Sequence, residues 1–185
     1  AALHNISSFN PANYDFILTL CASCASHLKN NYPLLIGDIP GREPKVRQFC
    51  DRVLDFSSFV REHAGFKKDW EEGREKKFAY HAPCHLCRGL GVYSAPKEIL
   101  KAAGLTYVPC PGEDSCCGFG GSYSVKFPEI SGEIAINKLE EVRKSGASIL
   151  ATDCPGCIMQ LRGTAEKQGY DLQVRHTAEI LADCK

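Results

Sequence analysis

Two adjacent cysteines, Cys116 and Cys117, are followed directly by a glycine-rich run, so that the segment reads CCGFGG. Neighbouring side chains of an extended backbone point to opposite faces, so both thiols serve one site only if the chain turns sharply beside them. Gly118, Gly120 and Gly121 supply the unusual dihedral angles for such a turn, and they let the backbone approach a bulky inorganic group. The loop therefore predicts a site larger than a single metal ion.

Three further cysteines follow predicted strands and are expected at the same edge of the fold. Cys84 follows the apolar run FAYHAP, whereas Cys154 and Cys157 follow ASILATD as a C-x-x-C hook. The carboxyl ends of parallel strands share one edge of a sheet, and ligands bind there. Pro155 suits the first turn of a helix, whose amide groups and positive dipole end favour thiolates over thiols. Five thiols are thus predicted to meet at this edge.

A set of five thiolates exceeds what one zinc ion needs. Zinc takes four ligands in a tetrahedron, whereas thiolate-rich sets are typical of iron–sulfur clusters. We therefore favour a cluster, with zinc as the alternative. A C-x-x-C hook alone is weak evidence, because it also occurs as a structural zinc hook or a redox pair.

Other residues near these motifs have ordinary structural interpretations. Cys87 and Cys110 are expected to be packed thiols, since free cysteine behaves as a small hydrophobe. His81 and His176 end predicted strands, where we expect helix capping or backbone hydrogen bonds rather than metal binding. His85 either hydrogen-bonds a cluster sulfur or lies on the surface.

A second C-x-x-C hook indicates an internal repeat. Cys21 and Cys24 each lie 133 positions before their counterparts in the later hook, and Lys29 lies 133 positions before Arg162. Each hook follows an apolar run and precedes a helix-like stretch. The double cysteine has no counterpart in the first copy, so the chain is predicted to begin midway through its first repeat.

Alternating strand and helix patterns predict the fold class. We expect an α/β fold, a three-layer parallel sheet with helices on both faces, in two pseudo-repeated units of which the first is truncated. The predicted division is a partial unit at 1–66, a charged linker at 67–77 and a complete cysteine-rich domain at 78–185. Glycine and proline predict a loop at 37–47, and 54–63 is predicted to be helical.

The composition excludes several classes of protein. Lysine plus arginine equals aspartate plus glutamate at 22 each, so no global field favours nucleic acid. No apolar run is long enough for a bilayer span. The chain has eleven cysteines in 185 residues, but its long helical and strand patterns argue against a small secreted disulfide scaffold. A reducing compartment, the cytoplasm, is expected.

The segments HAPCHLCRG, CCGFGGSYSVKFPE and TDCPGCIMQL closely resemble the cysteine-rich CCG domain, whose pattern is C, then CCG, then C-x-x-C. That domain occurs in the catalytic subunit of heterodisulfide reductase and in iron–sulfur subunits of glycolate oxidase and lactate-utilisation dehydrogenases. The resemblance covers about 78–184 as a complete domain and 1–66 as the second half of a preceding one. It implies a [4Fe–4S] cluster of noncubane type on Cys84, Cys116, Cys117, Cys154 and Cys157. In the first unit only Cys21 and Cys24 match, and the resemblance implies that they too are cofactor-binding. The early cysteine and the CCG of that unit are absent, so this chain alone cannot complete its cluster.

The motifs look more like the glycolate and lactate branch of this family. The resemblance then implies an iron–sulfur subunit of an oxidoreductase complex that relays electrons from the oxidation of a 2-hydroxy acid. Its partners would be a flavin-containing dehydrogenase subunit and other iron–sulfur subunits, through which a cytoplasmic protein would also lie peripheral to the membrane. No catalytic residue is assigned, and we expect the cluster to be lost from protein prepared in air.

Two alternatives differ in chemistry. One is a disulfide-cleaving cluster subunit like that of heterodisulfide reductase. The other is a zinc-binding structural or docking domain without redox function.

Overall fold

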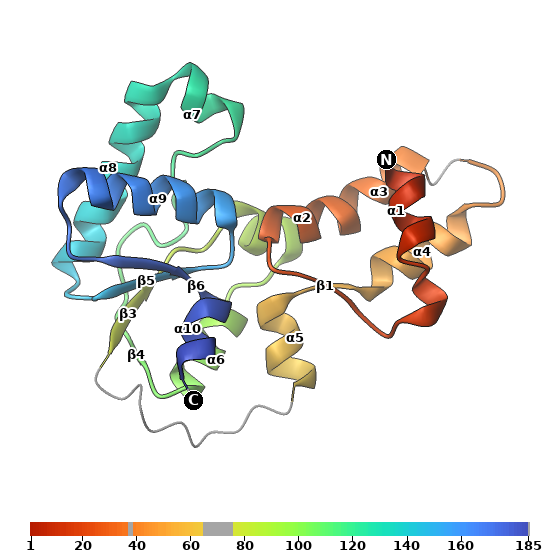
Figure 1. The fold of residues 1–185 in the computed structure, drawn as a ribbon, viewed down its shortest axis with the longest axis horizontal. Helices are drawn as coiled ribbons and strands as arrows, with labels where there is room; N and C mark the ends of the chain where they lie inside the picture. Colours follow the sequence, from red (N-terminus) through yellow and green to blue (C-terminus); the bar gives the residue numbers. More distant parts are fainter. Residues whose placement is uncertain (37–38, 65–75, 185) are drawn as a thin grey trace.

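The computed structural model describes residues 1–36, 39–64 and 76–184, which form two parallel sheets flanked by helices (Figure 1). The larger sheet has four strands in the order β4-β3-β5-β6, and the smaller pairs β1 with β2. The strands are β1 (Ile17–Thr19), β2 (Val53–Asp55), β3 (Lys77–Tyr80), β4 (Thr106–Tyr107), β5 (Ile149–Thr152) and β6 (Gln173–His176). All the pairings between these strands are parallel, so the predicted α/β class with a parallel sheet flanked by helices is confirmed.

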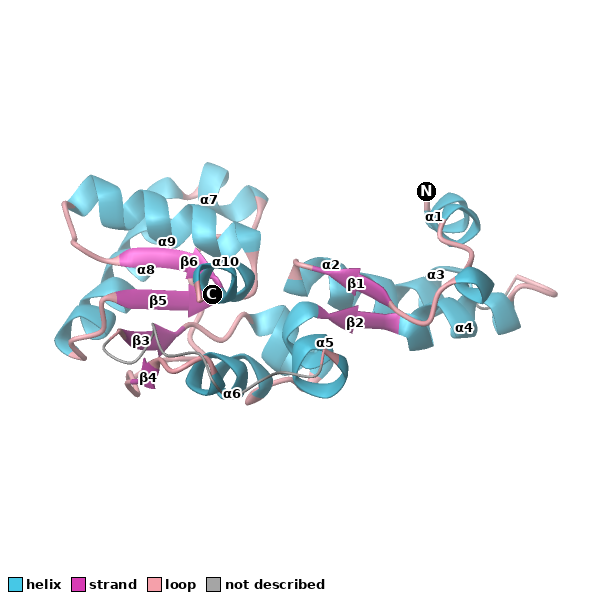
Figure 2. Cartoon of the chain, turned by 60° about the horizontal axis from the view of Figure 1, so that its bottom comes forward, coloured by secondary structure: helices cyan, strands magenta, loops and turns pink. Residues whose placement is uncertain are grey.

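Helices cover both faces of the larger sheet (Figure 2). Helices α8 (Pro128–Lys144) and α9 (Pro155–Gln168) pack on one face, and α6 (Ala95–Ala102) and α10 (Thr177–Asp183) pack on the other. Strand β5 is buried throughout, with Leu150 in one core cluster and Ile149 in the other. Continuous apolar runs of this kind are typical of parallel strands buried on both faces.

The smaller sheet carries its own core. It is formed by α1 (Ala2–Ser8), a 3-10 turn (Pro11–Asn13), α2 (Ala22–Ser26), a π-helical turn (His27–Asn31), α3 (Tyr32–Ile36) and α4 (Glu43–Arg52). Ile6, Tyr32, Phe49 and Val53 fill its centre. Helix α5 (Phe56–His63) instead contributes Val60 to the core of the larger sheet and so ties the two parts together.

The predicted loop at 37–47 is wrong in its second half. Helix α4 begins at Glu43, with Pro44 in its first turn. Proline is tolerated there because its missing N–H group would have no helical partner. Composition alone suggested a loop, whereas the buried side chains of α4 pack it into the smaller core.

The predicted helix at 54–63 begins later than expected. Val53–Asp55 form strand β2, and the Asp55 carboxylate then caps α5 by accepting a hydrogen bond from the Ser58 amide at 2.9 Å. The short elements that were not predicted include α7 (Ser122–Lys126) and the π-helical turn His85–Gly89. Most of the predicted linker, 67–75, lies outside the described residues, and Lys77 begins β3.

The two hooks have the same local geometry. Cys21 caps α2 with φ −133° and ψ 109°, and Cys154 caps α9 with φ −133° and ψ 113°. Lys29 donates to the carbonyl of Val53 at 3.3 Å, and Arg162 donates to that of Val174 at 3.0 and 2.8 Å. Each basic side chain therefore contacts the strand that follows its own hook, β2 in the first copy and β6 in the second. A repeat would require such parallels. Among the described residues, no helix combines the length and apolar character needed to cross a membrane.

Candidate metal centre

Four thiols from distant parts of the sequence lie in a row at the carboxyl edge of the strands. The Sγ atoms of Cys117 and Cys157 are 3.2 Å apart and buried. The Cys154 thiol interacts with those of Cys157 and Cys21. The first turn of α2 therefore faces the first turn of α9, as Figure 1 shows, and the Ala22 amide donates to the Asp153 carbonyl at 3.0 Å.

The remaining predicted ligands lie on the exposed side of this row. Cys84 and Cys116 are both exposed, and the Gly118 amide donates to the Cys116 Sγ at 3.3 Å. The pKa of Cys84 is raised by burial of its thiol and by the negative charges of neighbouring thiolates, that of Cys116 first among them. Cys84 therefore lies within electrostatic range of Cys116, Cys117 and Cys154. All five predicted cluster cysteines thus lie at one rim.

Two glycines allow this close approach. Gly118 has φ +86°, and a Cβ atom there would lie 2.5 Å from the backbone oxygen of Ser131 on α8. A Cβ atom at Gly156, within the C-x-x-C hook, would lie 2.7 Å from the ring of Phe119. Only glycine fits both the dihedral angle and the contact at Gly118. The absence of a side chain at Gly118 therefore lets the loop pack directly against α8.

Lys138 fixes the residues that precede the double cysteine. Its side chain is buried on α8, and Nζ donates to the carbonyls of Gly112 at 2.6 Å and Ser115 at 3.0 Å, and to the Ser115 hydroxyl at 3.0 Å. Burial lowers the pKa of this amine, and the surrounding thiolates oppose that effect. The ammonium group therefore orients the loop and places a positive charge beside the thiols.

Hydrogen bonding within the row favours thiolates at alternate positions. The contact with Cys157 lowers the pKa of Cys117 to about 4, against the opposing effect of burial. Contacts with Cys157 and Cys21 likewise lower the pKa of Cys154. The pKa values of Cys157 and Cys21 are raised, because their protons are shared with these neighbours. Thiolates are the form that binds metal.

The side chain of His81 points into the same group. It is 1% exposed, and within the described residues neither ring nitrogen has a hydrogen-bond partner. One donor atom each of His81, Cys117 and Cys157 lie within 4.8 Å of one another. An unpaired buried polar group costs about 1–3 kcal/mol, so this imidazole is held at a cost in stability.

The Asp153 carboxylate joins the two parts of the fold beside the hook. It accepts hydrogen bonds from the hydroxyls of Ser57 at 2.7 Å, Tyr80 at 2.7 Å and Thr177 at 3.0 Å. These residues come from α5, β3 and α10. Burial raises the pKa of Asp153, and the three hydroxyl donors counteract this. The carboxylate thus organises the backbone that precedes Cys154.

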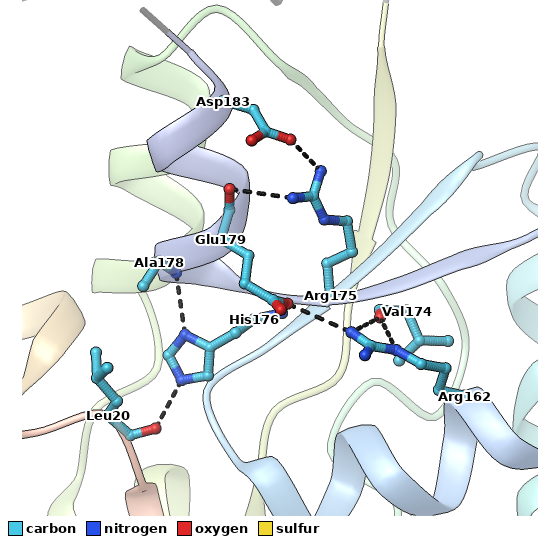
Figure 3. Close-up of polar contacts among 8 residues, drawn as sticks. All are labelled: Leu20, Arg162, Val174, Arg175, His176, Ala178, Glu179 and Asp183. Carbon is cyan, nitrogen blue, oxygen red and sulfur yellow. Dashed lines mark hydrogen bonds and ion pairs between the residues drawn. The ribbon is translucent and has the colours of Figure 1, made fainter.

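His176 forms a second link between the parts (Figure 3). Its Nδ1 accepts a hydrogen bond from the Ala178 amide at 3.0 Å, so the proton lies on Nε2, which donates to the Leu20 carbonyl at 2.7 Å. Glu179 completes the capping box by accepting from the His176 amide at 2.7 Å. The predicted capping role of His176 is confirmed.

The remaining cysteines and histidines near the centre lie as follows. Cys87 is buried in the core of the larger sheet, as predicted, and Cys110 is half-buried with its thiol donating to the Pro111 carbonyl at 3.4 Å. His85 is exposed, with Nδ1 3.6 Å from the Cys84 Sγ. The expectation of a backbone hydrogen bond for the His81 side chain is wrong, because its ring faces thiols instead.

Two features of the centre were missed. Lys138 occupies the buried stripe of α8 together with Ala135, Leu139 and Val142, so a lysine at apolar spacing was the available signal. The contact between Cys21 and Cys154 had no sequence signal, because it depends on how α2 docks against α9.

Comparison with known proteins agrees with this geometry. The family model of the CCG cysteine-rich domain matches residues 1–29 and 78–162. The chain belongs to the CCG family. Two matched segments of this CCG protein contain both hooks, Cys84 and the double cysteine.

Curated relatives share nearly the whole of this CCG chain. "Lactate utilization protein A" of Exiguobacterium sp. is 33% identical over 97% of this chain and 73% of its own length. The protein of the same name from Lysinibacillus sphaericus is 36% identical over 95% of this chain and 76% of its own length. That of Geobacillus sp. is 36% identical over 98% and 75%, respectively.

The donor set of the CCG centre fits a soft transition metal or an iron–sulfur cluster. Thiolates dominate it, an unpaired imidazole adjoins them, and a buried cation offsets their charge. The residues present therefore suit the metal group that this family implies.

Proposed function

We propose that this CCG protein is an iron–sulfur subunit of a lactate-utilisation system and that it relays electrons from the oxidation of a 2-hydroxy acid. The observation that carries the proposal is the convergence of the CCG loop and the hook, with the Sγ atoms of Cys117 and Cys157 3.2 Å apart. The shared name of the relatives supports lactate as the acid.

The cysteines that would hold the cluster come from three segments: the residues after β3, the CCG loop and the hook at the start of α9. The proposed ligands are Cys84, Cys116, Cys117, Cys154 and Cys157. A bound iron–sulfur cluster supplies one-electron transfer. The buried thiols on α9 and the CCG loop keep one side dry, whereas Cys84 and Cys116 leave the other side open to a redox partner. Lys138 counters part of the negative charge of the thiolates.

The partners follow from the chemistry of the reaction. Oxidation of a 2-hydroxy acid releases two electrons and two protons, and a flavin accepts them together, whereas an iron–sulfur centre takes electrons singly. We therefore place a flavin-containing dehydrogenase subunit before this protein and further iron–sulfur subunits beside it.

Anaerobic reconstitution with ferrous iron and sulfide tests the cluster. We expect iron and acid-labile sulfide near the stoichiometry of one cluster, with an EPR signal after oxidation or reduction. Cys117→Ser is expected to abolish most of this uptake. Cys50→Ser is the matched control, because Cys50 is a buried thiol in the core of the smaller sheet. Retention of zinc with no iron uptake would reject the proposal.

Substrate specificity needs the assembled system. With the dehydrogenase subunit present, lactate is expected to reduce the reconstituted centre, and omission of this protein should stop electron flow to the acceptor. Reduction of a heterodisulfide instead, with no response to lactate or glycolate, would favour the disulfide-cleaving alternative.

A further inference from the structure

The His81 imidazole shares a buried pocket with two thiols. His81 follows β3, Cys117 belongs to the CCG loop and Cys157 lies in the first turn of α9. All three residues are buried, and neither nitrogen of His81 has a hydrogen-bond partner within the described part of the chain. Burial lowers the pKa of this imidazole, and its interaction with the Cys117 thiol opposes that effect, so the thiol is a group that the ring faces.

The spacing of the three donor atoms suits one ion. They lie within 4.8 Å of one another, and the two Sγ atoms are 3.2 Å apart. Around a tetrahedral zinc ion, with bonds of about 2.0–2.3 Å, neighbouring ligand atoms lie roughly 3.5–3.8 Å apart. Small rotations of these side chains would therefore place all three donors on a single metal. Ligands bound to different irons of a cluster lie further apart.

The charges of the pocket also balance for one divalent ion. Two thiolates neutralise a dication, and a neutral imidazole donates a lone pair without adding charge. Such a neutral unit is far less costly to bury than an uncompensated ion. His and Cys together are the ligands that zinc and ferrous iron accept.

We propose that His81, Cys117 and Cys157 form a binding site for a single divalent transition-metal ion, with an imidazole nitrogen as the third ligand. Binding releases the Cys157 proton to solvent, since Cys117 is already a thiolate, and transfers no electrons. The fourth position of the tetrahedron is left to a water molecule. This site shares Cys117 and Cys157 with the proposed cluster, so the single ion and the cluster are alternative occupants of one centre.

Anaerobic titration of the full chain with Co²⁺ tests the site. We expect thiolate-to-cobalt charge-transfer bands, visible bands typical of tetrahedral cobalt, and release of about one proton per ion near neutral pH, from Cys157. His81→Ala is expected to weaken Co²⁺ binding at least about tenfold, as loss of one ligand does, and to shift the visible bands. The exposed His4 of α1 provides the control, and His4→Ala should leave affinity and spectrum unchanged.

X-ray absorption of the unmodified protein with one equivalent of Zn²⁺ provides a test that needs no variant. A shell with two sulfur ligands and one imidazole is expected, whereas sulfur ligands without imidazole would overturn the proposal. Equal Co²⁺ affinity and identical spectra for His81→Ala and the unmodified protein would also overturn it.

The same preparations separate this site from the proposed function. Protein that binds Co²⁺ through His81 but assembles no cluster supports the single-ion site and rejects the iron–sulfur proposal. Protein that assembles the cluster but binds cobalt without imidazole supports the iron–sulfur proposal and rejects the single-ion site.

Discussion

Replacing Lys138 with methionine should loosen the CCG loop. Methionine keeps most of the length and apolar bulk of lysine but removes the ammonium group that donates to Gly112 and Ser115. Hydrogen bonds from a charged group are worth about 1.5–3 kcal/mol each, so these three contribute roughly 4.5–9 kcal/mol before costs are subtracted. Burial of the ammonium costs several kcal/mol, and the substitution removes this cost as well. We expect a net loss of about 2–4 kcal/mol.

Urea denaturation of the metal-free protein measures this loss. Lys144→Met is the matched control, because Lys144 lies on the same helix and makes an exposed ion pair with Glu141. Solvent screens such exposed pairs, so the control should change the free energy of unfolding little. Iron uptake under reconstitution should fall for Lys138→Met and stay unchanged for Lys144→Met, since only the former disturbs the loop before Cys116.

Equal losses of stability in the two variants would contradict the role of Lys138 in holding the loop. A Lys138→Met variant that unfolds at lower urea but takes up iron as the unmodified protein does would contradict it too, because the lysine would then stabilise α8 without positioning the loop. Hydrogen exchange at the Ser115 to Gly118 amides distinguishes a local opening from a global loss.

Three further predictions concern other parts of the centre. Gly118→Ala should lower the free energy of unfolding by about 2–4 kcal/mol, because it adds a backbone clash to the strain of a positive φ. Gly121→Ala, which has open space around it, should lower it by about 1 kcal/mol in the same denaturation series. Equal losses would contradict the contact of Gly118 with α8. Asp153→Asn should lower the free energy of unfolding by about 1–3 kcal/mol, since the amide nitrogen cannot accept the hydroxyl donors, and an unchanged thermal midpoint would show that the carboxylate does not join the two parts. Burial raises the pKa of Cys50, so a thiol reagent at about pH 8 should modify it only after unfolding; peptide mapping that finds early modification would contradict its burial.

The positions of the cysteines after strands were predictable because a short apolar run identifies each parallel strand, and the carboxyl ends of such strands share one edge of the sheet. ASILATD is apolar and continuous, so it had to be a buried strand, and the hook that follows had to lie at the carboxyl edge. The same holds for FAYHAP and Cys84. The turn at Gly118 was likewise predictable, because two adjacent thiols can serve one site only if the backbone turns beside them.

What could not be predicted depends on how separate elements meet. The burial of His81 is set by the CCG loop and α9, which are distant in sequence, and a histidine at a strand end usually finds a backbone partner. The boundary of α4 was missed because proline and glycine were read as a loop, although proline also begins helices. In both cases the tertiary contact overrides the local signal.

The contacts that join the two sheets surround the metal centre. The Ala22 amide bonds to the Asp153 carbonyl, the His176 ring to the Leu20 carbonyl, and Ser57 to the Asp153 carboxylate, and each pair lies within a few residues of a hook. Any group that binds the folded centre must therefore also stabilise this joint, by about 2.7 kcal/mol at a free concentration a hundred times its dissociation constant. Both sheets should then gain protection from hydrogen exchange together when the centre is loaded. A gain confined to the larger sheet would mean that the first hook takes no part in holding the group.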